Sequence, residues 1–458
     1  MIPVIDTADQ PTTSSGPTSF PSDMPTDATP ATTAAVAPSG SPAQQATSPG
    51  GTPAQQSGNP PPGAGSVQQN TGTSAKKQLV IPQPAFQPGD YTDLGQATVL
   101  SRAYAYALRY NPGTGWMVFG GSYYEESACK AQRIAQTLTD IQFKDAQRVQ
   151  AECQTELEKT GIWDKIIASK ASHSPMPDLD DDEKKVYDLY IEMDYFKKFI
   201  LHARSSRSIS AALREAQALL YIDSDAFDAD PFLLNTPNYT VDLRTGQLLA
   251  HDYRYYLTKQ TAVDPSDIGK DIFDAALDTF FCGDMELVSY VQEIAGIALI
   301  GAVFEEFLVI AYGVGRNGKS TFFNALASVL GDYAGGLSAE NLTTGKNNPQ
   351  PEMAELRGKR LVIASELEEG TRLNTARVKQ LCSTDKILAA KKYHQPIQFT
   401  PTHTLVLYTN HLPRVGGLDD GIWRRIKVVP FNAKIEGGND IKNYANYLVQ
   451  NAGGAILA

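Results

Sequence analysis

The segment GVGRNGKS at 313–320 combines three glycines with a lysine and a serine at the spacing G-x-x-x-x-G-K-[ST]. The glycines let the backbone turn tightly, so that several N–H groups can point at phosphate oxygens. Lys319 supplies a positive charge for the β- and γ-phosphates, and Ser320 supplies a hydroxyl for Mg²⁺. The pattern predicts a nucleotide site formed by Gly313, Val314, Gly315, Arg316, Asn317, Gly318, Lys319, Ser320 and Thr321.

The residues on either side of this loop predict the elements that would hold it. The run Phe307–Tyr312 is short, apolar and β-branched, which is typical of a buried parallel strand. A helix that begins at the lysine would add the positive end of its dipole to the phosphate site. A fortuitous glycine-rich turn is the alternative, and it would need neither the strand nor the helix.

A second buried strand is predicted at RLVIAS (360–365), and acidic residues follow it directly. We expect a carboxylate at the carboxyl end of the strand beside the phosphate loop to handle Mg²⁺ and the attacking water. Glu366 is the first candidate and Glu368 the second. A solvated turn rich in glutamate is the alternative.

Two further strands end or begin next to polar side chains that suit ATP hydrolysis. TLVLY (404–408) leads into Asn410, whose amide could hydrogen-bond both the γ-phosphate and the attacking water; otherwise Asn410 is a turn residue. Arg424 and Arg425 stand just before the strand at IKVV. An arginine held stiffly at a subunit boundary can stabilise the charge on a neighbour's phosphates, whereas ordinary surface arginines are the alternative.

The segment KILAAKKYHQPIQFTPT (386–402) predicts a β-hairpin with a basic tip at Lys391, Lys392 and His394. Such a tip, with Tyr393 beside it, could follow a nucleic-acid backbone electrostatically and stack on a base. An exposed hairpin whose lysines prevent edge-to-edge aggregation fits the local sequence equally well.

Composition limits the classes of function. The net charge is −11 and the pI near 5.1, which excludes a protein that coats nucleic acid, so any such contact must be local. The four cysteines form no C-x-x-C pair, so the sequence shows no zinc site and fits a reducing, cytoplasmic setting. The first residues, MIPVIDTADQ, are no secretory signal, and the longest apolar stretch, 294–304, is too short to span a membrane.

The chain divides into three parts by composition. Residues 1–75 contain no Lys or Arg and are rich in Pro, Ser and Thr, so we expect a disordered low-complexity tail over 1–89 that is a tether, a partner-recruiting segment or a bare linker. A mainly helical α+β domain is expected over 90–270, and an ATPase domain over 285–458. The acidic run DLDDDE (178–183) is read as a loop that leads into a helix, in preference to a metal site.

Taken together, these blocks resemble the superfamily 3 helicases, in the phage and plasmid primase-helicase group shared with poxvirus-type primase-helicases. The resemblance is carried by YGVGRNGKSTF, PEMAELRGKRLVIASELEEGTRLN, VKQL, TPTHTLVLYTNHLPRV and DDGIWRRIKVVPF. The segment 91–263 also resembles the domain that precedes the helicase core in that family. The resemblance therefore covers about 90–458.

The resemblance implies an α/β fold, with an AAA+-like P-loop ATPase core built on a parallel sheet. It implies a ring, expected to be a homo-hexamer, that hydrolyses ATP with Mg²⁺ and translocates on single-stranded or forked DNA during phage, plasmid or viral replication. By the same likeness, Lys319 and Ser320 match the phosphate loop and Glu366 the acidic motif. Asn410 matches sensor 1, and Arg425 or Arg424 matches the arginine finger. Lys391, Lys392 and His394 fall at the DNA-tracking hairpin.

The chain departs from the family pattern in three respects. Leu367 follows Glu366 where adjacent acids are common, so either Glu366 or Glu368 remains open as the base. Residues 1–90 are too poor in carboxylates for a primase, so a separate primase or polymerase is expected. The chain stops at NAGGAILA within a predicted helix, which indicates a fragment or a shortened form. Two other functions stay open: an ATPase that remodels protein or packages nucleic acid, and an ATP-switched initiation scaffold.

Overall fold

The computed structural model describes residues 79–344, 351–389, 397–416, 420–436 and 441–458. All of them belong to the second of two units into which the chain divides, Met1–Ser74 and Ala75–Ala458. The tail expected over 1–89 lies outside the described residues up to position 78. Among the helices of the described ranges, none is both long and apolar enough to cross a membrane.

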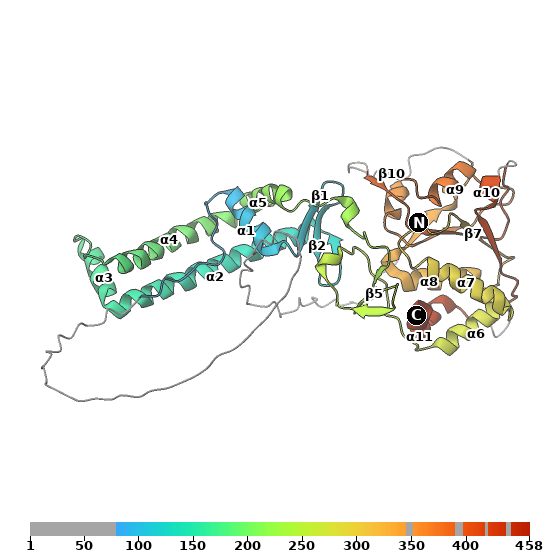
Figure 1. Ribbon diagram of the computed structural model, residues 1–458, viewed down its shortest axis with the longest axis horizontal. Coiled ribbons are helices and arrows are strands. Elements are labelled where there is room, and N and C mark those ends of the chain that lie inside the picture. Colours follow the sequence, from blue (N-terminus) through green and yellow to red (C-terminus); the bar gives the residue numbers. More distant parts are fainter. Residues whose placement is uncertain (1–78, 345–350, 390–396, 417–419, 437–440) are drawn as a thin grey trace, which may run out of the picture. The chain divides into compact units, whose positions relative to one another are not determined.

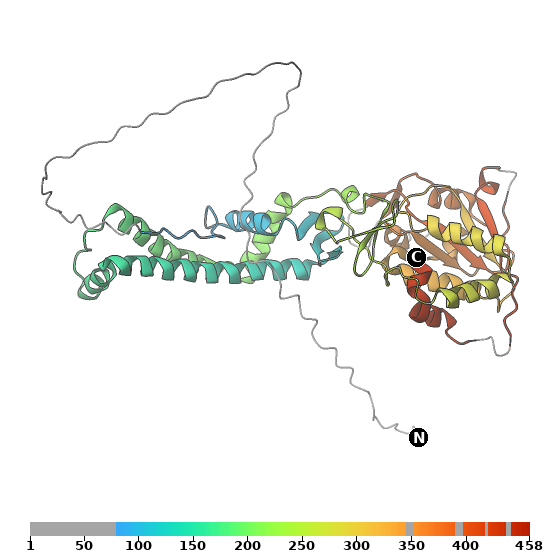
Figure 2. The ribbon, with the colours of Figure 1, turned by 60° about the horizontal axis from the view of Figure 1, so that its bottom comes forward.

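A long helical hairpin forms the first part of the described chain. Helices α2 (Ala128–Thr160) and α4 (Asp181–Ala203) run side by side, with α3 (Ile162–Ser172) between them in sequence (Figures 1 and 2). The predicted loop before α4 is confirmed, because the Asp180 carboxylate caps the helix by accepting from the backbone N–H groups of Asp182 and Glu183. The acidic run therefore serves a helix start.

The segment YTDLGQATVLSRAYAYALRY (91–110) predicts a single helix, but the observed helix is shorter. Helix α1 covers Asp93–Tyr104, and the chain then enters β1 (Leu108–Asn111). The turn and β-hairpin that NPGTGWMVFGGSYYEE (111–126) predicts are confirmed, because β2 (Gly115–Phe119) pairs antiparallel with β3 (Tyr124–Glu126). Strand β1 pairs antiparallel with the other edge of β2. Cross-strand pairing by Leu108 and its neighbours outweighs their helical periodicity, because tertiary contacts override local propensity.

Residues 230–263 predict short strands separated by turns, and three short strands are present there. They are β4 (Leu233–Asn235), β5 (Thr240–Asp242) and β6 (Gln247–Leu249), paired antiparallel in that order. Leu234 and Val241 are buried in the same apolar cluster as residues of the later helices, such as Phe280 and Phe322. These strands therefore pack into the core that holds the candidate site.

The central sheet is five-stranded and entirely parallel, which confirms the mixed α/β class. Its spatial order is β13-β7-β12-β9-β8, so the strands, numbered along the chain, lie in the order 5-1-4-3-2. Because all five run in one direction, the residues that follow their carboxyl ends gather at one edge. The strands are β7 (Leu308–Tyr312), β8 (Ala334–Ser338), β9 (Leu361–Ser365), β12 (Thr404–Thr409) and β13 (Ile426–Pro430).

Both faces of this sheet are covered, which explains its nearly continuous apolar strands. On β7, Val309 and Ala311 pack into one apolar cluster, while Leu308 and Ile310 pack into the other. This alternation follows the two-residue period of a strand.

The remaining elements are α5 (Ser206–Leu219), α6 (Lys270–Phe281), α7 (Met285–Ile297), α8 (Lys319–Leu330), α9 (Thr375–Leu381), α10 (Asp420–Trp423), α11 (Tyr444–Leu457), β3 (Tyr124–Glu126), β10 (Ile387–Ala389) and β11 (Ile397–Phe399).

A buried arginine joins β4 to the amino end of the sheet. Arg360, just before β9, is 3% exposed, and its guanidinium lies 4.4 Å from the centre of the Tyr333 ring. It donates to the Leu233 carbonyl at 2.5 Å and to the Leu299 carbonyl. The Tyr333 hydroxyl in turn accepts from the Asn235 N–H at 3.1 Å. The arginine thus ties three segments together at the end of β9 opposite to Glu366.

Candidate functional site

The loop between β7 and α8 has a shape that two of its glycines dictate. A Cβ atom at Gly313 would overlap the Asn317 amide and the Phe431 carbonyl. Gly318 has φ +80°, and a Cβ there would overlap the ring of Phe280. A side chain at either position would displace the loop, because both positions are closed by neighbouring atoms and Gly318 is left-handed.

The loop is anchored to the segment that follows β13. The Asn317 side chain is buried, and its Nδ2 donates to the Phe431 carbonyl at 3.0 Å. The Ile435 N–H donates to the Arg316 carbonyl at 2.8 Å. The sequence pattern assigned Asn317 only to the loop; its anchoring contact depends on a residue more than a hundred positions away.

Lys319 lies at the centre of the candidate site. It is 5% exposed, and its Nζ donates to the Gly313 carbonyl at 2.9 Å and to Asn410 Oδ1 at 2.8 Å. Burial lowers the pKa of Lys319, while the charge of Glu366 acts in the opposite direction. The structure therefore brings together the lysine, the asparagine and the acid that the sequence proposed from three separate strands.

Glu366 and Glu368, which the sequence left as alternatives, have different positions. Glu366 lines the same cavity as Lys319, has φ +58°, and its N–H donates to the Tyr408 carbonyl at 3.1 Å. Both glutamates are exposed, but Glu368 is not among the residues that line this cavity. The geometry thus favours Glu366 as the acid that faces the loop.

One expectation about the position of the acidic strand in the sheet was wrong. We expected β9 to lie directly beside β7, but β12 lies between them. Asn410 is therefore at the tip of the adjacent strand, and Glu366 is one strand further away. Crossover order is a tertiary property that the pattern of a single strand does not encode.

The cavity has a volume of about 240 Å³ and two chemically different sides. The loop, with Ser320 and Thr321, forms the polar side together with Glu366, Thr409 and Asn410. The other side consists of apolar and aromatic residues that sequence reasoning missed: Phe280, Tyr408, Ile435, Ile441 and Tyr444. The Phe280 and Tyr444 rings meet edge to face, 6.2 Å between centres. No local motif marks them, because they come from α6, β12, α11 and the segment before α11.

Oxygen ligands for a divalent cation are present on the polar side. The described residues hold no cluster of three or more His, Cys, Asp or Glu side chains that could bind a metal alone. Ser320 and Glu366 nevertheless line one cavity. Mg²⁺ usually takes one or two protein oxygens and completes its shell with phosphate oxygens and water. The donor set fits Mg²⁺ bound together with a nucleotide.

The two arginines before β13 differ in their surroundings. Arg425 forms an ion pair with Glu306, and its Nη1 donates to the Gly421 carbonyl at 2.7 Å. Its own carbonyl accepts from the Leu308 N–H at 2.7 Å, so it lies at the amino end of the sheet, opposite to the loop. Arg424 is exposed and forms no ion pair with any described residue. Of the two, Arg424 is available to another molecule.

The predicted hairpin is present as β10 and β11, which pair antiparallel from Ile387 with Phe399 to Ala389 with Ile397. Lys391, Lys392 and His394 lie outside the described residues, so their role stays a prediction.

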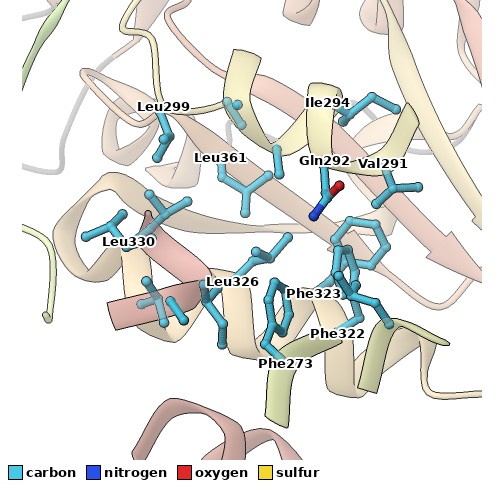
Figure 3. A pocket seen from close by; sticks show the side chains of 18 of the residues that line it. Phe273, Val291, Gln292, Ile294, Leu299, Phe322, Phe323, Leu326, Leu330 and Leu361 are labelled. Carbon is cyan, nitrogen blue, oxygen red and sulfur yellow. The ribbon is translucent and has the colours of Figure 1, made fainter. Parts of the chain in front are cut away.

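A second cavity, of about 290 Å³, lies within the apolar core (Figure 3). Phe273, Ile294, Phe322, Leu326 and Leu361 are among the side chains around it. Its few polar lining residues include Lys270, Asp274 and Gln292, and none of them belongs to the loop. This cavity is therefore separate from the loop, and it is the more apolar of the two.

Comparison with known proteins supplies an independent view of the chain. A family described as "D5 N terminal like" matches residues 97–282, and a "Family of unknown function (DUF5906)" matches 311–425. "Putative helicase L207/L206" of Acanthamoeba polyphaga mimivirus is 32% identical over 33% of this chain and 16% of its own length. "Putative primase C962R" of African swine fever virus is 23% identical over 51% of this chain and 26% of its own length.

Among solved structures, the apo C-terminal region of NrS-1 is 18% identical, with a TM-score of 0.34 over 43% of this chain and 46% of that one. The chain spans about a quarter or less of the length of the two viral relatives.

The D5-like match and the viral relatives, which are named putative helicase or putative primase, support a place for this chain in the phage and viral primase-helicase family over the residues that they cover.

Proposed function

We propose that this chain hydrolyses ATP with Mg²⁺ and uses the energy to move a ring-shaped helicase along DNA during phage, plasmid or viral replication. The observation that carries the proposal is the contact of Lys319 Nζ with Asn410, in a cavity that Glu366 also lines. Phosphoryl transfer needs a cation on the β- and γ-phosphates, a metal, and a group that orients water. The AAA+-like P-loop assignment of the core belongs to the same proposal.

Each polar group has a role in this proposal. Lys319 would exchange its two oxygen acceptors for phosphate oxygens, and the loop N–H groups would cradle the phosphates. Ser320 and Glu366 would hold Mg²⁺ directly or through water, which supplies Lewis-acid chemistry when bound. Asn410, next to the lysine, would orient the attacking water. Phe280, Ile435 and Tyr444 would form the apolar wall for the base and sugar.

The position of the arginines supports a ring. Arg424 is exposed and lies at the opposite end of the sheet from the loop of its own chain, so in this proposal it would serve a neighbour's nucleotide. Arg425, fixed to Glu306, would hold the segment in place. The hexamer expected from the family resemblance would provide such a neighbour at every site.

The test is ATP hydrolysis by the purified chain, with and without single-stranded DNA. Lys319→Ala should abolish turnover while leaving the circular dichroism spectrum unchanged, and Arg424→Ala should also be inactive. Mixing the two variants should restore part of the activity, because one supplies an intact loop and the other an intact arginine. Normal turnover by Lys319→Ala would refute the proposal, and failure of the mixture to recover would refute the role of Arg424.

DNA dependence separates the proposal from its alternatives. We expect single-stranded DNA to stimulate hydrolysis several-fold, and Lys391→Ala with Lys392→Ala to remove the stimulation and keep the basal rate. Basal hydrolysis that ignores DNA would instead favour an ATPase that remodels protein. Nucleotide binding without hydrolysis would favour an initiation scaffold.

A further inference from the structure

Three segments that leave the carboxyl ends of β8, β9 and β12 pair with one another beyond the sheet. Thr343 forms an antiparallel bridge with Leu373, and Arg372 forms a parallel bridge with Arg414. The Arg414 N–H donates to the Thr371 carbonyl at 2.8 Å, and the Leu373 N–H donates to the Arg414 carbonyl at 2.9 Å. Backbone hydrogen bonds on both sides therefore hold the chain rigid at Arg372.

The pairing places two arginines on one exposed face. Leu373 is 1% exposed, and Val415 packs against the same apolar cluster. Because neighbouring residues in extended chain point to opposite faces, Arg372 and Arg414 point away from that cluster. Both are exposed. Residues paired in a parallel bridge lie on the same face, so the two cations share one surface.

Gly416 makes room for the Arg372 guanidinium, and Gly370 lies at ordinary contact distance from Arg414. A Cβ atom at Gly416 would overlap the Arg372 guanidinium, and one at Gly370 would come within 3.9 Å of Arg414 Nη2. Gly416 is two residues beyond Arg414, and Gly370 is two residues before Arg372. Each arginine thus lies across the face of the opposite segment.

This arrangement is unfavourable without an anion. Like charges directly opposite each other on paired strands are destabilising. The arginines that form ion pairs within the described ranges are Arg148, Arg204, Arg244, Arg254 and Arg425. Neither Arg372 nor Arg414 is among them. The pair therefore presents ten N–H donors in two planar forks, the geometry that best matches phosphate oxygens.

We propose that Arg372 and Arg414 form a phosphate-binding site that receives the backbone of single-stranded DNA. The identity of this ligand rests on the proposed function. Because the net charge of the chain is −11, the protein can hold a polyanion only where cations are concentrated locally. It follows Glu366 by six residues and Asn410 by four along the chain. A bound phosphate would thus be connected through short, hydrogen-bonded segments to both groups at the cavity.

The experiment is fluorescence anisotropy of a labelled oligothymidine of about 20 nucleotides, longer than a typical single-strand site, with the full chain and no nucleotide. Arg372→Gln with Arg414→Gln should weaken binding about tenfold or more at low salt. It should also reduce the slope of log K against log salt by about 0.7, because the pair neutralises one phosphate and each neutralised phosphate contributes about 0.7 for a single strand. The control is Arg102→Gln with Arg133→Gln, two exposed arginines on α1 and α2. It should leave affinity and slope unchanged.

Several outcomes would overturn the site. Unchanged affinity in the double variant would do so, as would a wild-type chain that does not bind the oligonucleotide. Unchanged DNA affinity with a loss of DNA-free ATP hydrolysis would assign the phosphate to a nucleotide held by a second copy of the chain. The binding assay contains no nucleotide, so it tests this site independently of ATP hydrolysis. Absence of ATP hydrolysis by the wild type would refute the proposed ATPase, and the binding assay would still decide for or against this site.

Discussion

Replacement of Arg360 by methionine should destabilise the core by about 3 kcal/mol. The guanidinium makes two hydrogen bonds to carbonyls and one contact with the Tyr333 ring. Hydrogen bonds from a charged donor contribute about 1.5–3 kcal/mol each, and a desolvated cation–π contact about 2 kcal/mol. Burial lowers the pKa of Arg360, which reports a desolvation cost that offsets part of this gain. Methionine would restore packing but leave the Leu233 and Leu299 carbonyls without the donor.

The assay is urea unfolding followed by circular dichroism, comparing the midpoint at unchanged m-value. Arg254→Met is the matched control, because Arg254 is an exposed arginine paired only with Asp252. An exposed pair of this kind contributes about 0–1 kcal/mol, so the control should stay close to the wild type. If Arg360→Met lowered the urea midpoint no more than Arg254→Met, the conclusion that Arg360 stabilises the contact between β4 and the sheet would be wrong.

Two further predictions concern the acid at the cavity and a buried histidine. Glu366→Gln should lower kcat by about 10²–10⁴, the contribution typical of a positioned acid or base, while Glu368→Gln should stay near wild type. Equal losses at saturating ATP would contradict the assignment. Burial lowers the pKa of His403 to about 4, and neither of its ring nitrogens has a hydrogen-bond partner among the described residues. The unfolded chain, with a pKa near 6.5, then binds more protons, so stability should fall by up to about 3 kcal/mol as pH drops from about 6.5 to 4. His403→Phe should flatten this dependence in urea midpoints at about pH 7 and pH 4.5, and an unchanged slope would contradict it.

The sequence was sufficient for most elements of the core. The strands around Leu308, Leu361 and Leu405 were predicted because buried parallel strands read as continuous apolar runs. The hairpin at β10 and β11 and the helix start at the acidic run 178–183 were also predicted, since both depend on local patterns.

The rest of the site depends on contacts between distant residues. The position of β12 between β7 and β9 follows from crossover packing, not from any strand alone. Phe280 and Tyr444 reach the cavity from helices far apart in sequence. In the sequence they cannot be distinguished from aromatic residues of the ordinary core. Arg360 was predicted only as the first residue of a buried strand, and its contacts are with Leu233, Leu299 and Tyr333, which are distant in sequence. Only the structure reveals its partners.

The order of the strands in the sheet has a consequence for biosynthesis. Strand β7 pairs with β12 and β13, and its first partner residue, Leu405, is made roughly a hundred residues later. At a synthesis rate of about 5–20 residues per second, that delay is on the order of 5–20 s. Throughout it, the apolar segment LVIAY lacks both neighbours and exposes two strand edges. The strand that leads into the candidate site is thus the one most in need of a chaperone during translation.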